Sequence, residues 1–171
     1  ETSIKRSMKI SNKQKNNFIK SLKQVGDYLL EKRSRFLNRG NWNKGQFKNE
    51  SDKIIDKLLK NKLTSILDVP ILSEEKIVKI NKKKNIYWLI DPIDGTASYA
   101  NGYDGFVTQA ALIKDNKPIL AGVFAPQKKL MFHAIKNGGA FLNNKKIVIN
   151  KTTIVDNIID NFNKPFYHCI F

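Results

Sequence analysis

Two aspartates that follow an apolar run are the residues of this sequence best suited to chemistry. Asp91 and Asp94 stand three residues apart around Pro92, and a glycine and a threonine follow them directly. A proline turn brings nearby side chains together, so both carboxylates and the Ile93 carbonyl are expected to converge on one hard cation, which prefers oxygen ligands. The segment therefore predicts a site that holds metal ions against a phosphate.

Gly95 and Thr96 extend this prediction to the phosphate itself. Glycine lets the backbone pass close to a ligand. If a helical turn begins at Thr96, its free backbone N–H groups form an anion site and its hydroxyl can orient a water. The alternative is an ordinary turn, since Asp-Pro and Asp-Gly pairs are common in loops. The position of the whole string after a strand favours a functional site.

Two further acidic features are prominent because the chain is poor in acid, with 15 Asp and Glu against 31 Lys and Arg. Glu74 and Glu75 close a predicted turn and short strand over residues 68–73, and a solvated loop is the alternative for this pair. Asp52 begins a stretch of helical periodicity, where a lone aspartate would be favoured by the helix dipole. The apolar face of that stretch comprises Ile54, Ile55, Leu58, Leu59, Leu63, Ile66 and Leu67.

The elements that must position these carboxylates indicate an α+β domain with a mostly antiparallel sheet flanked by helices. A first helix is predicted over residues 14–36, where one stripe carries Phe18, Leu22, Val25 and Leu29. Residues 39–48 are predicted to form a mobile loop that leads to the Asp52 helix. We expect no internal repeat and no linker that divides the domain.

Strands are predicted from short apolar runs separated by turn residues. Residues 86–90 form a strand that delivers Asp91 to its end, where Pro92 is expected to stop the ladder. The later strands are predicted over residues 106–113, 119–124, 130–135 and 146–149. Short turns between them, including one at residues 138–139, favour an antiparallel meander. His133 lies in the third of these strands and is expected to be structural.

The combination of Asp52, residues 72–75 and residues 88–96 resembles the signature of the inositol monophosphatase superfamily, which comprises magnesium-dependent, lithium-sensitive phosphatases. Within it, residues 68–75 and 117–126 are most similar to the 3'(2'),5'-bisphosphate nucleotidase (CysQ-like) branch. The similarity implies the N-terminal half of the sugar-phosphatase (αβαβα) fold, with residues 14–153 as the domain. The segment 91–96 is the most specific part of the resemblance.

The resemblance also implies a role for each matched residue. It assigns about two or three magnesium ions to oxygen ligands from Glu74, Asp91, Ile93 (through its carbonyl) and Asp94. It assigns catalytic roles, the polarisation of the attacking water above all, to Asp52, Thr96 and Glu74. It places the substrate phosphate against Ile93, Asp94, Gly95 and Thr96.

The sequence departs from the family's pattern in two places. Asn49 stands where the family usually has threonine, three residues before the aspartate at position 52. The family's second signature, a Trp-Asp pair followed by two alanines, supplies a further metal ligand and is not found in these 171 residues. We expect residues 1–13 to be disordered and residues 154–171 to be the start of a C-terminal domain or an aberrant tail.

Three functions stay open at this stage. The first is a phosphomonoesterase that removes the 3'(2')-phosphate of adenosine bisphosphates such as 3'-phosphoadenosine 5'-phosphate, with inositol-1-phosphate as the alternative substrate. The second is a truncated, catalytically inactive remnant. The third is a basic binding module, because the net charge is +16 and such a charge suits nucleic acid. Lysine and asparagine are abundant throughout, as a bias in the coding DNA would produce, so we expect no specific nucleic-acid partner.

Cysteine usage and hydropathy bear on the compartment. A single cysteine excludes an internal disulfide and a cysteine-cluster metal site. No apolar run approaches the ~18 residues of a membrane span, and the first thirty residues lack a signal-peptide core. We therefore expect a cytoplasmic protein without a membrane span whose partner is a small phosphorylated substrate. The resemblance implies a homodimer.

Overall fold

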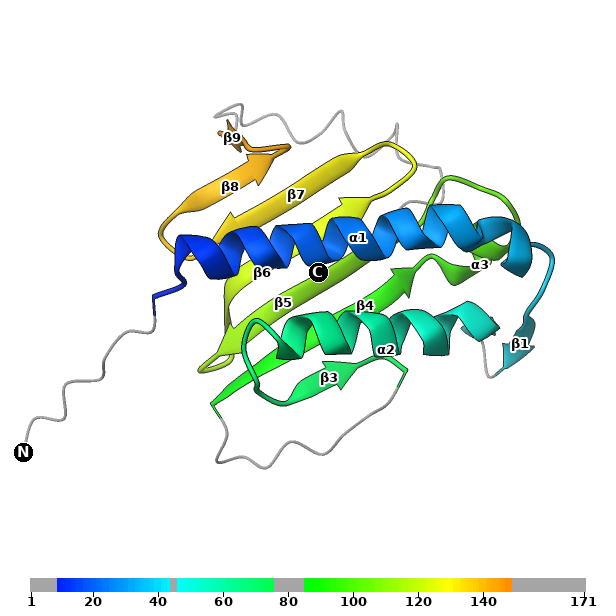
Figure 1. The fold of residues 1–171 in the computed structure, drawn as a ribbon, viewed down its shortest axis with the longest axis horizontal. Helices are drawn as coiled ribbons and strands as arrows, with labels where there is room; N and C mark the ends of the chain where they lie inside the picture. Colours follow the sequence, from blue (N-terminus) through cyan, green and yellow to red (C-terminus); the bar gives the residue numbers. More distant parts are fainter. Residues whose placement is uncertain (1–8, 44–45, 76–84, 149–171) are drawn as a thin grey trace, which may run out of the picture.

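Two long helices lie next to each other across one face of a seven-stranded sheet (Figure 1). The computed structural model describes residues 9–43, 46–75 and 85–148. Helix α1 comprises Asn12–Phe36 and helix α2 comprises Glu50–Thr64. The expected tail at residues 154–171, and residues 1–8 of the segment expected to be disordered, lie outside the described residues. The arrangement confirms an α+β domain.

Helix α1 begins two residues before the predicted position because Ser11 caps it. The Ser11 hydroxyl accepts a hydrogen bond from the Gln14 backbone N–H at 3.1 Å, and the Ser11 N–H donates to the Gln14 side chain at 3.0 Å. This reciprocal capping box gives hydrogen-bond acceptors to two backbone N–H groups at the start of the helix. The predicted apolar stripe is confirmed, since its four members are fully buried: Phe18, Leu22, Val25 and Leu29.

Helix α2 also begins two residues early, and its cap involves a candidate site residue. Asn49 is the N-cap, its side-chain oxygen accepts from the Ser51 N–H at 2.9 Å, and its own N–H donates to Asp52 at 2.7 Å. Asn49 thus fills the position usually held by threonine with a residue that caps well. The predicted apolar face is wrong for Ile54, which is 37% exposed, because it lies about 100° around the helix from its buried neighbour.

The sheet is a meander with one parallel edge. Strand β3 runs parallel to β4, and every other neighbouring pair in the order β3-β4-β5-β6-β7-β8-β9 is antiparallel. The bounds are Ile71–Ser73 for β3, Ile86–Asp94 for β4, Val107–Lys114 for β5, Lys117–Ala125 for β6, Leu130–Ile135 for β7, Gly139–Leu142 for β8 and Lys145–Ile147 for β9. The predicted meander is confirmed.

Three local predictions about the strands were wrong. Residues 41–48 contain the antiparallel strands β1 (Asn41–Asn43) and β2 (Gln46–Lys48), where a mobile loop was expected. Trp42 packs edge to face on Phe47 at 5.6 Å, which stabilises that pair. Strand β8 was not predicted, and its first residue, Gly139, was assigned to a turn. Strand β4 continues past Pro92, with its register shifted between Asp91 and Asp94.

The hydrophobic core lies between the helices and the sheet. Phe18 of α1 stacks on Trp88 of β4 with ring centroids 5.6 Å apart, and the Trp88 indole N–H donates to the Leu67 carbonyl at 3.1 Å. Gly122 of β6 lies beneath α1, where a Cβ would come within 2.8 Å of the Phe18 side chain. The close approach of helix and sheet fixes where β4 delivers its acidic end.

Within the described residues, no helix combines the length and hydropathy that a membrane span requires.

Candidate metal and phosphate site

The end of β4 brings two of the predicted metal ligands to one amide. Gln109 lies opposite Asp91 in the β4–β5 ladder. Its Nε2 donates to Asp94 Oδ2 at 2.9 Å and lies 3.5 Å from Asp91 Oδ2. The shift of register after Asp91 turns both carboxylates toward the same neighbouring side chain. The structure therefore places Asp91 and Asp94 side by side, although they are three residues apart in a strand.

Glu74 follows directly on β3, whose last residue pairs with Ile90 one position before Asp91. The pKa of Asp91 is raised to about 7, first by burial and then by the negative charges of Glu74 and Asp94, while the Gln109 hydrogen bond lowers it. Glu74 and Asp94 are thus close enough to repel the negative charge of Asp91. A divalent cation would relieve this repulsion.

The acidic cluster is not a closed cage. Among the described residues, no group of three acidic, histidine or cysteine side chains is arranged to hold one ion. The hard oxygen donors of Asp91 and Asp94 nevertheless suit magnesium, which keeps several waters and usually takes one or two protein carboxylates. The chemistry of the donors at the end of β4 therefore fits this ion.

Asp52 and Thr96 meet beside this cluster. The Thr96 Oγ1 lies 3.2 Å from Asp52 Oδ1 and 2.9 Å from the Ile93 carbonyl oxygen. Asp52 is only 2% exposed. Its pKa is raised to about 6 by burial, against the opposing effect of the hydrogen bond from the Asn49 backbone. Asp52 is thus a buried carboxyl that can change its charge near neutral pH.

Gly95 makes the turn between β4 and α3 (Thr96–Ala100). Its φ is +88°, in the left-handed region that favours glycine. A Cβ at this position would lie 2.3 Å from the Gly105 carbonyl oxygen. Because Gly95 is the N-cap of α3, the helical turn begins at Thr96, which is the condition on which the expected anion site depends.

Arg33 of α1 holds the segment that follows this turn. Its Nε donates to the Tyr99 carbonyl at 3.1 Å, and its Nη2 donates to the carbonyls of Ser98, at 3.3 Å, and Tyr103. The Tyr99 hydroxyl donates back to the Leu29 carbonyl of α1 at 2.9 Å. These contacts fix α3, and with it Thr96, against the first helix.

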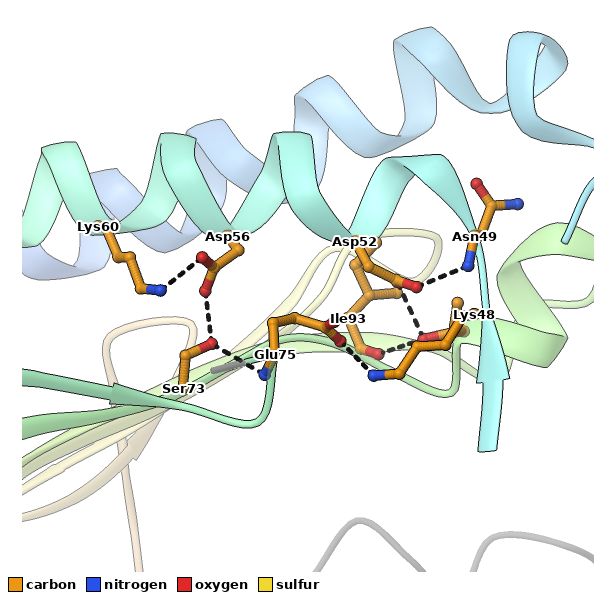
Figure 2. A network of polar contacts seen from close by, with 9 residues as sticks. Lys48, Asn49, Asp52, Asp56, Lys60, Ser73, Glu75 and Ile93 are labelled. Carbon is orange, nitrogen blue, oxygen red and sulfur yellow. Dashed lines mark hydrogen bonds and ion pairs between the residues drawn. The ribbon is translucent and has the colours of Figure 1, made fainter. Parts of the chain in front are cut away.

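A second network ties the end of β3 to α2 (Figure 2). The Ser73 hydroxyl donates to Asp56, which also forms an ion pair with Lys60 at 2.5 Å. Glu75 forms an ion pair with Lys48 of β2 at 2.7 Å. The charge of Glu75 raises the pKa of Asp52, and the charge of Lys48 lowers it. Glu75, the second residue of the Glu74–Glu75 pair, therefore influences the pKa of Asp52.

Sequence reasoning missed Gln109 and Lys48 as members of the site. Gln109 sits in a strand, where a single polar residue usually faces solvent, and only the β4–β5 register shows its role. Lys48 is one of many lysines in a basic chain. Its position directly before the Asn49 N-cap, four residues before Asp52, was the one local signal.

An open hollow adjoins the acidic cluster on the sheet face away from the helices. It has a volume of about 550 Å³, and its lining includes Glu74, Asp91, Gln109, Ala111 and Ala121. Strand alternation produces this face, because residues such as Leu89, which is 48% exposed, point away from the helices while their neighbours are buried. The carboxylates therefore lie at the edge of an accessible, mostly apolar surface.

Comparisons with known proteins identify one family of similar sequences. The sequence model of the inositol monophosphatase family matches residues 13–163. The 3'(2'),5'-bisphosphate nucleotidase CysQ of Haemophilus influenzae is 35% identical over 123 residues, which cover 68% of this chain and 43% of that protein. Inositol monophosphatase 2 of Saccharomyces cerevisiae is 36% identical over 107 residues, which cover 61% of this chain and 37% of that protein.

A solved structure with the same fold is that of an IMPase/NADP phosphatase complexed with Mg²⁺ and phosphate. It superimposes with a TM-score of 0.68 at 26% identity, over 78% of this chain and 52% of that chain. The chain thus spans less than half the length of these two curated relatives and about half of the solved structure.

Proposed function

The chain belongs to the inositol monophosphatase family, and from this premise we propose that its acidic cluster takes part in the magnesium-dependent hydrolysis of a phosphate monoester. The observation that carries the proposal is the meeting of two groups of residues at the end of β4. Asp91 and Asp94 share the Gln109 amide, and Thr96 links Asp52 to the Ile93 carbonyl beside them.

The proposed magnesium ligands are Glu74, Asp91, Asp94 and the Ile93 carbonyl. Burial and mutual repulsion hold the pKa of Asp91 at about 7, so a cation that replaces the proton gains an electrostatic stabilisation. When bound, magnesium supplies charge neutralisation for the phosphate and makes a coordinated water more acidic. The solved family structure complexed with Mg²⁺ and phosphate supports this choice of ion.

Thr96 and Asp52 are proposed to orient the attacking water and receive its proton. Thr96 Oγ1 can accept a hydrogen bond from water while it donates its own proton toward Asp52 Oδ1, 3.2 Å away. A general base works best with a pKa near the working pH, and that of Asp52 is raised to about 6. The role of Gly95 and Thr96 is to present the turn against which the phosphate lies.

The proposed substrate is the 3'(2')-phosphate of an adenosine bisphosphate such as 3'-phosphoadenosine 5'-phosphate. The CysQ relative, matched over 123 residues, supports this choice. Inositol-1-phosphate is the second candidate, because the yeast inositol monophosphatase is equally similar over a shorter span. The cytoplasmic location and the homodimer stay predictions, to be tested by fractionation and by sedimentation.

The direct test is phosphate release by the 171-residue chain from both substrates, with magnesium and with EDTA. We expect magnesium-dependent release that Asp91→Asn abolishes and that Asp68→Asn, which changes an exposed aspartate, leaves intact. Release that survives Asp91→Asn would contradict the metal assignment. Saturable magnesium binding without release from either substrate would instead favour the inactive remnant.

A further inference from the structure

A second groove lies between α1 and the strands β7 and β8, and it shares no lining residue with the hollow beside the acidic cluster. Its volume is about 690 Å³. Figure 1 shows the N-terminal half of α1 running along this side of the sheet. The groove is therefore a feature separate from the proposed phosphatase site.

Three lysines of α1 line this groove: Lys15, Lys20 and Lys23. Within the described part of the chain, none of them forms an ion pair, although Asp27 also lines the groove. Asn16 and Asn144 contribute amide groups to the same lining. The groove thus combines uncompensated positive charge with neutral hydrogen-bonding groups.

His133 of β7 supplies an independent sign that a polar ligand belongs here. It lines the groove, is only 5% exposed and stacks on Phe141 with ring centroids 5.0 Å apart. Its Nδ1 is buried and has no hydrogen-bond partner among the described residues. Because an unsatisfied buried polar atom is costly, this nitrogen is expected to have a partner in the functional protein.

The charge state of His133 is compatible with a donor role. Burial lowers the pKa of His133, and the positive charges of Lys15 and Lys23 lower it further. The imidazole is therefore neutral near pH 7, and one of its nitrogens carries a proton.

We propose that this groove binds a phosphate-bearing small molecule. Lys15, Lys20 and Lys23 would contact the oxyanion, and His133 Nδ1 would donate a hydrogen bond to it. Several ammonium groups beside neutral amides suit a multiply charged oxyanion, because charge-assisted hydrogen bonds are about twice as strong as neutral ones.

The test is calorimetric titration of the 171-residue chain with inorganic pyrophosphate in EDTA at about 0.15 M salt, which screens exposed charges. EDTA removes divalent cations, so the acidic cluster repels the probe and cannot account for binding. We expect saturable binding that the double variant Lys15→Gln/Lys23→Gln weakens by about tenfold or more.

The matched control is Lys53→Gln/Lys57→Gln, which removes the same charge from two exposed positions of α2. The control is expected to bind within about twofold of the unchanged chain. Equal losses of affinity in the two double variants would show that binding depends only on the overall positive charge of the chain, which is +16. That result would overturn the proposal. An absence of saturable binding would do the same.

His133→Phe separates a ligand contact from a structural role. The substitution keeps an aromatic ring against Phe141 and removes the buried nitrogen. We expect it to raise the thermal midpoint of the ligand-free chain and to weaken pyrophosphate binding at the same time. A raised midpoint with undiminished affinity would remove His133 from the site and count against the proposal.

Discussion

The Thr96 hydroxyl lies between two oxygens that belong to different elements, 2.9 Å from the Ile93 carbonyl of β4 and 3.2 Å from Asp52 Oδ1 of α2. The second carboxylate oxygen of Asp52 accepts the Asn49 N–H at 2.7 Å. Asp52 is therefore held by the Asn49 N-cap of its own helix on one side and by Thr96, in the turn after β4, on the other. The proposed base and the proposed phosphate contact are parts of one hydrogen-bonded unit.

Thr96→Val should raise the pKa of Asp52 above its value of about 6, because the Thr96 hydrogen bond lowers that pKa. The substitution keeps the branched shape and removes the hydroxyl, so we also expect a loss of about 1 kcal/mol in the free energy of unfolding. Carbon-13 NMR titration of the Asp52 carboxyl measures the shift. Thr96→Ser keeps the hydroxyl and should leave the pKa unchanged, and equal pKa values in both variants would contradict the link.

The metal-free chain should lose stability as the pH rises from about 4 to about 7. An unfolded aspartate has a pKa near ~3.9, whereas that of Asp91 is raised to about 7 and that of Asp52 to about 6. Between these values the folded state holds more protons than the unfolded state, so its free energy of unfolding falls with increasing pH. Urea unfolding in EDTA at several pH values tests the sign.

Magnesium should restore the stability that the metal-free chain loses at about pH 7, because an ion that binds only the folded state stabilises it. Asp91→Asn should flatten the pH dependence and abolish the magnesium effect, while Asp68→Asn preserves both. Stability that rises between about pH 4 and about pH 7 in EDTA would mean that the carboxylates do not repel one another as the structure indicates.

The elements that rest on local patterns were predictable. The stripe from Phe18 to Leu29 fixed α1, and the run before Asp91 fixed β4, since periodicity depends on neighbours along the chain. Gly95 was expected in a turn where the backbone passes close to a ligand, and the structure shows it in a turn with a positive φ. The proline turn predicted that Asp91 and Asp94 lie close together, whereas the grouping with Asp52 and Glu74 came from the family resemblance alone.

The contacts that rest on register and on distant segments were not predictable. Gln109 reaches Asp94 only because the β4–β5 ladder shifts after Asp91. Arg33 reaches the carbonyl of Tyr103, 70 positions away, because α1 packs against the segment that contains α3. Such pairings depend on how whole elements pack, so single-residue patterns carry no signal of them.

Gly95→Ala should destabilise the chain more than the same substitution at Gly102. The new Cβ would meet the Gly105 carbonyl at 2.3 Å, and φ is +88°. The backbone conformation alone costs about 1–2 kcal/mol for a residue with a Cβ, and the clash adds to it. Thermal unfolding of the purified variant measures the total.

Gly102→Ala is the matched control for this substitution. Its φ is +84°, nearly the same as that of Gly95, but its Cβ would meet only the Leu37 side chain, at an ordinary 3.7 Å. The difference between the two variants therefore isolates the close backbone approach from the cost of the left-handed conformation. Equal destabilisation would mean that the turn at Gly95 yields easily, and would weaken its proposed role beside the phosphate.

Arg33→Met should loosen the segment that carries the phosphate turn. The guanidinium donates to the carbonyls of Ser98, Tyr99 and Tyr103, and its loss leaves these acceptors without their hydrogen-bond donor. We expect faster hydrogen exchange from Ser98 to Tyr103 and a loss of about 1–3 kcal/mol in the free energy of unfolding. Arg35→Met removes an exposed arginine from the same helical turn and should leave that exchange unchanged. If both variants exchange alike, Arg33 does not hold α3, and the position of Thr96 depends on the sheet alone.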